Sequence, residues 1–141
     1  MLFLYEKNLY ISEKTFGVRI IMISIAMATY NGEKYLTEQI DSILVQTYSD
    51  FELIICDDCS TDNTCSILKE YAQKDKRIKL HFNTVNVGFK KNFEKILQFC
   101  TGEFIAFADQ DDVWLKDHIE ILINNIGNTD LIAGNAVITD S

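Results

Sequence analysis

Apolar residues recur along the chain with two different spacings, and the two spacings alternate. Apolar runs of strand length cover Arg19–Ala28, Phe51–Cys56, Ile78–Phe82 and Glu103–Ala108. After each run, apolar residues recur every three to four positions, as on one face of an α-helix. The helical positions are Leu36, Ile40, Ile43 and Leu44; Ile67, Leu68 and Tyr71; Phe89, Phe93, Ile96, Leu97 and Cys100; and Leu115, Ile119, Leu122, Ile123 and Ile126.

This alternation predicts an α/β fold, in which a mostly parallel sheet is flanked by helices on both faces and the crossovers are right-handed. Leu131–Ala133 and Ala136–Ile138 predict the beginnings of further strands. Residues 1–17 show neither spacing clearly, and we interpret them as an extension that is mobile or packed at an edge. Residues 18–141 are expected to form one domain, because no proline or low-complexity segment divides them.

Composition excludes some classes of protein. The 141 residues carry a formal net charge of −8, which argues against binding to nucleic acid because that binding relies on Lys and Arg at phosphates. The longest apolar run, residues 20–28, is much shorter than the roughly 20 residues that cross a bilayer. The first residues lack the pattern of a signal peptide. We therefore expect a cytoplasmic protein, and peripheral association with the inner face of the membrane stays open.

Acidic residues directly follow two of the predicted strands. Asp57 and Asp58 follow one strand, and Asp109, Asp111 and Asp112 follow another. In an open α/β sheet, ligands bind outside the carboxyl ends of the strands, so we expect these acids to converge on one crevice. The other two strands are followed by Thr29-Tyr30-Asn31-Gly32 and by Asn86-Val87-Gly88.

The acids indicate a site for a divalent cation and a phosphate. Mg²⁺ and Mn²⁺ take oxygen ligands, and Mg²⁺ usually combines one or two carboxylates with substrate phosphates. Neither a G-x-G-x-x-G nor a G-x-x-x-x-G-K-[ST] motif is present to hold phosphate by itself. A cation that bridges Asp111 to a diphosphate would neutralise both partners, and a diphosphate leaving a sugar is one such group. The alternative is a solvated acidic turn that caps the next helix.

Cysteine and histidine offer weaker candidates. Cys56 and Cys59 have the spacing of a redox pair or of half a zinc site. The two acids between them would raise a thiol pKa, and no second pair completes a zinc site. We expect all four cysteines to be free thiols. We interpret His81 as a strand residue and His118 as a residue on a helix surface.

Three segments resemble consecutive signatures of the inverting family 2 glycosyltransferases, whose nucleotide-binding half has the Rossmann-like GT-A fold. They are Ser24–Leu36, Gln46–Asp62 and Gly102–Trp114, and the resemblance runs from about Ile20 to the end of the chain. The form D-Q-D-D-V-W at 109–114 is similar to the subgroup of rhamnosyltransferases that act on bacterial surface polysaccharides.

The resemblance implies roles for the residues at the strand ends. Thr29 and Tyr30 would line the nucleotide base, and Asp57 or Asp58 would accept hydrogen bonds from base or ribose. Asn92 would lie near ribose and diphosphate, although it could also be a helix-surface residue. Asp109 and Asp111 would form the D-x-D element, with Asp111 as the main metal ligand. Trp114 would either form a wall of the sugar pocket or belong to the core.

The resemblance also implies a reaction. Family members transfer a sugar to the hydroxyl of a glycan or lipid-linked acceptor in surface polysaccharide synthesis. The resemblance implies a hexosyl or rhamnosyl group from a UDP- or dTDP-linked donor, with Mg²⁺ or Mn²⁺ as the cofactor. Their catalytic base is an acid on a later segment, so we expect it beyond Ser141 and assign it to no residue here. The chain would then be a donor-binding half, truncated at the C-terminus.

Two other classes compete with this reading. One is a nucleotide-sugar-binding module without catalysis, which a transfer assay would distinguish. The other is a phosphoryl-transfer or receiver-type domain, which the sequence disfavours because such domains need a Lys at a strand end. Apolar residues around Leu131 could also promote self-association.

Overall fold

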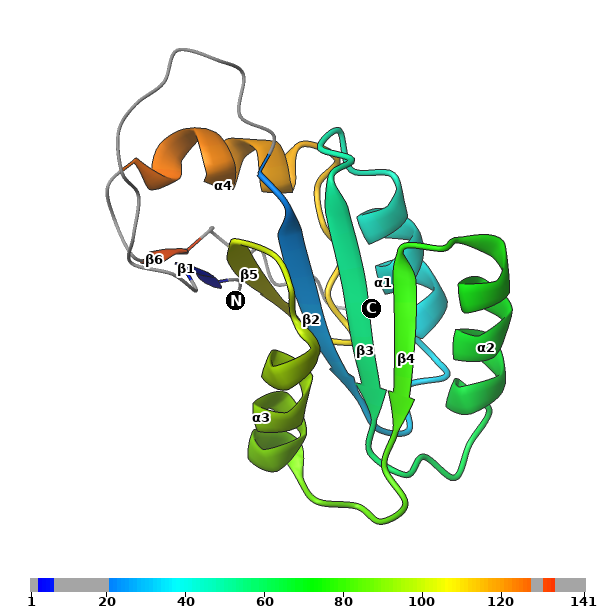
Figure 1. Ribbon diagram of the computed structural model, residues 1–141. Coiled ribbons are helices and arrows are strands. Elements are labelled where there is room, and N and C mark those ends of the chain that lie inside the picture. The colour runs from blue at the N-terminus through cyan, green and yellow to red at the C-terminus, as the bar shows by residue number, and fades with distance from the viewer. Residues whose placement is uncertain (1–2, 7–20, 128–130, 134–141) are drawn as a thin grey trace.

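The computed structural model describes residues 3–6, 21–127 and 131–133, which form an α/β fold around a six-stranded sheet with the order β4-β3-β2-β5-β1-β6 (Figure 1). The predicted fold class is confirmed. The pairs β2–β3, β3–β4 and β2–β5 are parallel, and β1 is antiparallel to β5 and β6. The strands are β1 (Phe3–Glu6), β2 (Ile23–Thr29), β3 (Phe51–Asp57), β4 (Ile78–Phe82), β5 (Phe104–Ala108) and β6 (Leu131–Ala133).

Helices cover both faces of the sheet, and the core is divided accordingly. One apolar cluster joins α1, α2 and α4 to one face, and a smaller cluster joins α3 to the other face (Figure 1). Successive residues of β3 point to opposite faces: Leu53 and Ile55 belong to the first cluster and Ile54 to the second. The helices are α1 (Leu36–Leu44), α2 (Thr64–Lys74), α3 (Phe89–Phe99) and α4 (His118–Ile126).

The beginning of the chain departs from the prediction. Within the range 1–17, expected to be an extension, Phe3–Glu6 forms β1 and lies inside the sheet. Leu4 pairs with Ala106 on one side and with Ile132 on the other. A four-residue strand is too short to display a recognisable alternation, which explains the miss. The strand predicted at Leu131–Ala133 is confirmed, and the one predicted at Ala136–Ile138 falls outside the described residues.

The last helix begins later than its apolar pattern predicts. Leu115 is 75% exposed and precedes α4, which starts at His118. The loop before the helix is held instead to the segment that follows α1: Gln46 Nε2 donates to the Leu115 carbonyl at 2.7 Å, and the Ile119 N–H donates to Gln46 Oε1 at 3.1 Å. Backbone groups in this segment thus find side-chain partners that replace a further helical turn.

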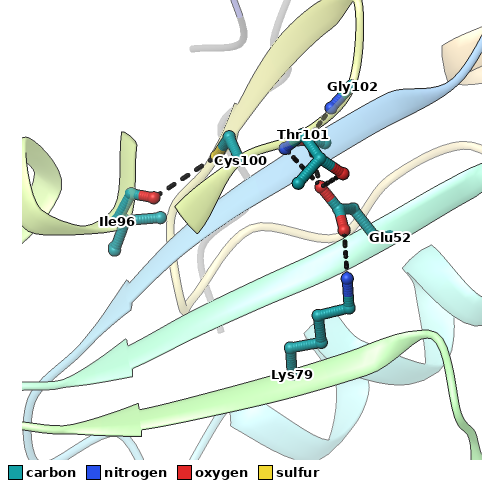
Figure 2. A network of polar contacts seen from close by, with 7 residues as sticks. Glu52, Lys79, Ile96, Cys100, Thr101 and Gly102 are labelled. Carbon is teal, nitrogen blue, oxygen red and sulfur yellow. Dashed lines mark hydrogen bonds and ion pairs between the residues drawn. The ribbon is translucent and has the colours of Figure 1, made fainter. Parts of the chain in front are cut away.

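A polar network ties three parallel strands together at the end of the sheet where these strands begin (Figure 2). Glu52 is buried, and its Oε1 accepts hydrogen bonds from Ser24 Oγ at 2.6 Å and from the Thr101 N–H at 2.7 Å. Its Oε2 pairs with Lys79 Nζ at 2.6 Å. Ser24 Oγ in turn accepts the Gly102 N–H at 2.8 Å. The turn that leads into β5 is therefore fixed to β2 and β3.

Cysteine and histidine take structural positions. No disulfide bond joins any of the four cysteines within the described residues. His81 lies on β4 as predicted, and its ring stacks on Phe99 at 3.6 Å between centroids. The interpretation of His118 as a helix-surface residue is wrong, because its ring lies 5.2 Å from that of Trp114 and burial lowers its pKa. Across residues 3–6, 21–127 and 131–133, no helix is long and apolar enough to cross a membrane.

Candidate functional site

A cleft of about 450 Å³ opens at the carboxyl ends of the parallel strands. It contains residues that follow β2, β3, β4 and β5, and of the acids predicted to converge there Asp58, Asp109 and Asp111 line it, whereas Asp57 and Asp112 do not. Its lining is Ala28, Thr29, Tyr30, Asp58, Asn86, Gly88, Phe89, Asn92, Asp109, Gln110 and Asp111. Of the residues predicted to bind nucleotide or metal, Asp57 does not line the cleft.

Asp58 organises the wall formed by the loop between β4 and α3. Its carboxylate accepts the N–H groups of Val87 at 2.9 Å and Gly88 at 2.8 Å, and Asn83 Nδ2 at 2.8 Å. Burial by itself would raise the pKa of Asp58, but these hydrogen bonds and the charge of Lys95 hold that pKa below its usual range. Gly88 has a φ of 84°, which favours glycine, and it immediately precedes α3. Asp58 is therefore an anchored carboxylate at the base of the cleft.

Asp57 performs a different task one residue earlier. Its side chain is buried and accepts hydrogen bonds from Thr29 Oγ1 at 3.0 Å and the Ser60 N–H at 2.8 Å. Cys65 Sγ also donates to it at 3.4 Å. These contacts connect the end of β2 to the loop before α2 and to the first turn of that helix. Asp57 thus builds the frame behind the cleft.

Asn92 lies on the inner side of α3. The helix-surface interpretation is wrong, because Asn92 is only 1% exposed. Its Nδ2 donates to the Cys56 carbonyl at 2.8 Å, and its Oδ1 accepts Asn83 Nδ2 at 2.9 Å. The side chain therefore joins α3 to the end of β3 while it lines the cleft.

The acids that follow β5 fit a hard divalent cation. Asp109 and Asp111 both line the cleft. Burial raises the pKa of Asp109, and the charges of Asp112 and Asp111 raise it further. A cation would relieve this repulsion. In the part of the chain that the structure describes, no three His, Cys, Asp or Glu side chains are grouped to hold a metal, which is compatible with a cation that takes further ligands from substrate phosphates.

Sequence reasoning missed several lining residues. Phe89, predicted on the apolar face of its helix, is 70% exposed at the cleft, with its ring 4.7 Å from that of Phe93. Its position directly after Gly88, at the start of the helix, is the feature of the sequence that could have indicated a place at the cleft. Gln110 lies between two acids, and its position in the sequence does not indicate that its side chain lines the cleft. Trp114 is 7% exposed and absent from the lining, so the core interpretation of this residue is confirmed.

The chain is similar to bacterial glycosyltransferases. It is 38% identical over 126 residues to the Escherichia coli UDP-Glc:alpha-D-GlcNAc-diphosphoundecaprenol beta-1,3-glucosyltransferase WfgD, covering 83% of this chain and 49% of WfgD. It is 37% identical over 99 residues to the Bacillus subtilis glycosyltransferase TuaG, whose name assigns it provisionally to teichuronic acid biosynthesis; 70% of this chain and 39% of TuaG are covered. The chain thus spans about half, or less, of the length of these curated relatives.

Solved structures agree with the sequence comparisons. Staphylococcus aureus TarS 1-349 in complex with UDP matches with a TM-score of 0.69 and 34% identity, over 75% of this chain and 32% of that one. The fold is also that of the Pyrobaculum calidifontis mannosyltransferase PcManGT in complex with GDP-Man and Mn²⁺, with a TM-score of 0.74 and 23% identity over 79% and 34% of the two chains. The sequence model described as Glycosyl transferase family 2 matches residues 24–140. Because this match contains all four strand ends that form the cleft, the chain belongs to glycosyl transferase family 2.

Proposed function

We propose that this chain forms the donor-binding part of a metal-dependent, inverting glycosyltransferase. The enzyme would transfer a hexosyl or rhamnosyl group from a UDP- or dTDP-linked sugar to the hydroxyl of a glycan or lipid-linked acceptor, in surface polysaccharide synthesis at the cytoplasmic face of a membrane. UDP in the TarS structure and the diphosphoundecaprenol-linked acceptor in the name of WfgD support this choice of donor and acceptor.

One observation carries the proposal: the cleft gathers three carboxylates and no basic side chain. Asp58, Asp109 and Asp111 line it, and none of its lining residues within the described ranges is Lys or Arg. These carboxylates would repel the negative charges of a diphosphate, and a cation between them would neutralise both partners. Asp111 and Asp109 would hold Mg²⁺ or Mn²⁺, which supplies charge neutralisation for a leaving diphosphate.

The remaining side chains are suited to the nucleoside. Tyr30 is 48% exposed beside the cleft, where its ring can stack on a base. An ionised carboxylate offers about four lone-pair sites. Asp58 has filled three of them with Val87, Gly88 and Asn83, and the fourth can accept a base or ribose donor. Asn92 is already tied to Cys56 and Asn83, so it would present a fixed amide toward ribose and diphosphate.

Calorimetry tests the proposal directly. We expect UDP or dTDP to bind this chain with Mn²⁺ or Mg²⁺, and to bind at least tenfold more weakly in chelator, which corresponds to about 1.4 kcal/mol. Asp50→Asn removes an exposed carboxylate outside the cleft lining and serves as the matched control. Equal affinity with and without metal would contradict the metal site, and no binding of either nucleotide would contradict donor binding.

A transfer assay tests whether this chain by itself catalyses sugar transfer, which a binding module would not do. The chain would be incubated with UDP-sugars, dTDP-rhamnose and a lipid-linked glycan acceptor, and products would be followed by mass spectrometry. Transfer supports a catalytic enzyme, and the donor that reacts decides between hexosyl and rhamnosyl transfer. Donor binding without transfer is expected both of a donor-binding part that lacks the catalytic base and of a binding module.

A further inference from the structure

The side chain of Gln110 bridges two loops that are far apart in the sequence. Gln110 lies between Asp109 and Asp111, after β5, and its carboxamide faces the backbone of Tyr30, after β2. The Tyr30 N–H donates to Gln110 Oε1 at 2.9 Å, and Gln110 Nε2 donates to the Tyr30 carbonyl at 3.1 Å. One amide therefore satisfies both main-chain polar groups of one residue.

The bridge occurs where the chain leaves the sheet. β2 ends at Thr29, so the backbone of Tyr30 can no longer rely on neighbouring strands for hydrogen bonds. Asn31 follows with a φ of 48°, and its N–H donates to Ser60 Oγ at 2.9 Å. The loop is thus held from one side by the segment after β3 and from the other side by Gln110.

The close approach of Gly32 shows that the bridge has little spare room. A Cβ added at Gly32 would lie 2.4 Å from Gln110 Oε1 and 2.8 Å from Gln110 Cδ. The three nearest heavy atoms to that Cβ all belong to Gln110. Glycine at position 32 therefore leaves the space that the carboxamide fills. An alanine there would displace the amide from the Tyr30 peptide, and it would meet none of these atoms if position 110 were alanine.

We propose that Gln110 is a positioning residue that couples the metal-binding loop to the nucleoside-binding loop. This inference rests on the proposed function, in which Tyr30 stacks on the base and Asp109 and Asp111 hold the metal. Gln110 fixes the backbone from which the half-exposed Tyr30 ring projects, although Gln110 itself belongs to the D-x-D segment. Loss of the bridge should weaken binding of a bare nucleoside, which carries no phosphate and needs no metal.

The experiment measures uridine and thymidine affinity in chelator for wild type, Gln110→Ala, Gly32→Ala and the double variant. Exchange of the Tyr30 amide hydrogen is followed by NMR in the same proteins. Loss of the two hydrogen bonds should weaken nucleoside binding by roughly fivefold to a hundredfold and accelerate exchange. Gln73→Ala, on the exposed side of α2, is the matched control and should behave as wild type.

The double variant distinguishes the bridge from a general loss of structure. We expect Gly32→Ala to reproduce the effect of Gln110→Ala and to add nothing when Gln110 is already alanine, since the clash partner is then absent. Gln110→Met keeps the bulk without the hydrogen bonds, and it replaces Gln110→Ala in the affinity and exchange measurements if that variant does not fold. Equal effects of Gly32→Ala in both backgrounds, or wild-type nucleoside affinity and Tyr30 exchange in Gln110→Ala, would overturn the inference.

Failure of the proposed function has a different signature. If wild type binds no nucleoside and no nucleotide, donor binding is rejected, and with it the role of Gln110 in that binding. The bridge itself is then judged by Tyr30 exchange and by the thermal stability of the four proteins. If wild type binds nucleotide and the Gln110 variants bind it equally well, only the coupling by Gln110 is rejected.

Discussion

Glu52→Gln should destabilise the protein because it removes a buried charge from the network in Figure 2. The glutamine oxygen can still accept the hydrogen bonds from Ser24 and Thr101, whereas its NH₂ group would face the Lys79 ammonium. The substitution therefore mimics protonation of Glu52 with little change in volume. It alters the turn into β5 at the end of the sheet opposite the cleft.

The pKa of Glu52 sets the expected magnitude. Burial by itself would raise this pKa, but hydrogen bonds from Lys79, Ser24 and Thr101 lower it from 4.5 to about 2. At 1.36 kcal/mol per unit, the displacement corresponds to about 3 kcal/mol of folding free energy. The Glu52 side chain is only 6% exposed, although Lys79 is 52% exposed, so solvent screening reduces this free energy little.

The sign of the pH dependence follows from the same shift. A carboxyl whose pKa is depressed in the folded state stabilises the protein above the unfolded-state pKa, and this contribution is lost as pH falls through the folded-state pKa. The free energy of unfolding should therefore differ by about 2–3 kcal/mol between wild type and Glu52→Gln at neutral pH. The difference should shrink between pH 4.5 and about 2, the two values that bound the shift.

Urea denaturation followed by circular dichroism measures this difference at each pH. Glu70→Gln is the matched control, because Glu70 and Lys74 form an i,i+4 pair with side chains 66% and 67% exposed, and the loss of such an exposed pair should change stability little. A wild-type minus Glu52→Gln difference that stays constant between pH 7 and about pH 3 would refute the reasoning.

Two further predictions concern the acids of the cleft and a close backbone contact. Asp111→Asn should abolish the metal dependence of nucleotide binding in calorimetry. Asp58→Asn should also weaken the binding of a bare nucleoside, because an amide at position 58 would oppose one of the N–H groups that donate to Asp58. Identical behaviour of the two variants would reject this division of roles. Gly102→Ala should lower the free energy of unfolding by about 3 kcal/mol, because its Cβ would lie 2.5 Å from the Ser24 backbone nitrogen, and a loss below about 1 kcal/mol in urea titration would contradict it.

The parallel core could be predicted because each strand is long enough to show its pattern. β3 has all seven residues buried, and a continuous apolar run is typical of a parallel strand covered on both faces. The acids after β3 and β5 could be placed at one edge for the same reason, since strand direction alone fixes where strand ends meet. Periodicity reports burial over several residues, so it could not reveal the four-residue β1.

The finer organisation of the site depends on hydrogen-bond partners that sequence spacing does not encode. Asp57 and Asp58 are adjacent and chemically identical, yet one frames the loop before α2 and the other lines the cleft. Their side chains diverge because the strand ends between them, so each meets a different set of backbone N–H groups. Gln110 shows the same limit: only the three-dimensional arrangement brings it to the Tyr30 peptide.

The position of β1 has a consequence for the order in which the molecule folds. Residues 3–6 pair with residues 104–106, about 100 positions later in the chain, and with residues 131–133, about 130 positions later. Long-range pairings of this kind are slow to form, because a large loop must close before any contact stabilises it. The β2–β5 core can assemble earlier, and until β1 arrives the outer edge of β5 has unpaired N–H and C=O groups. β1 is thus synthesised before the core but is one of the last elements to join it. Until β1 has paired, another chain could pair with the edge of β5.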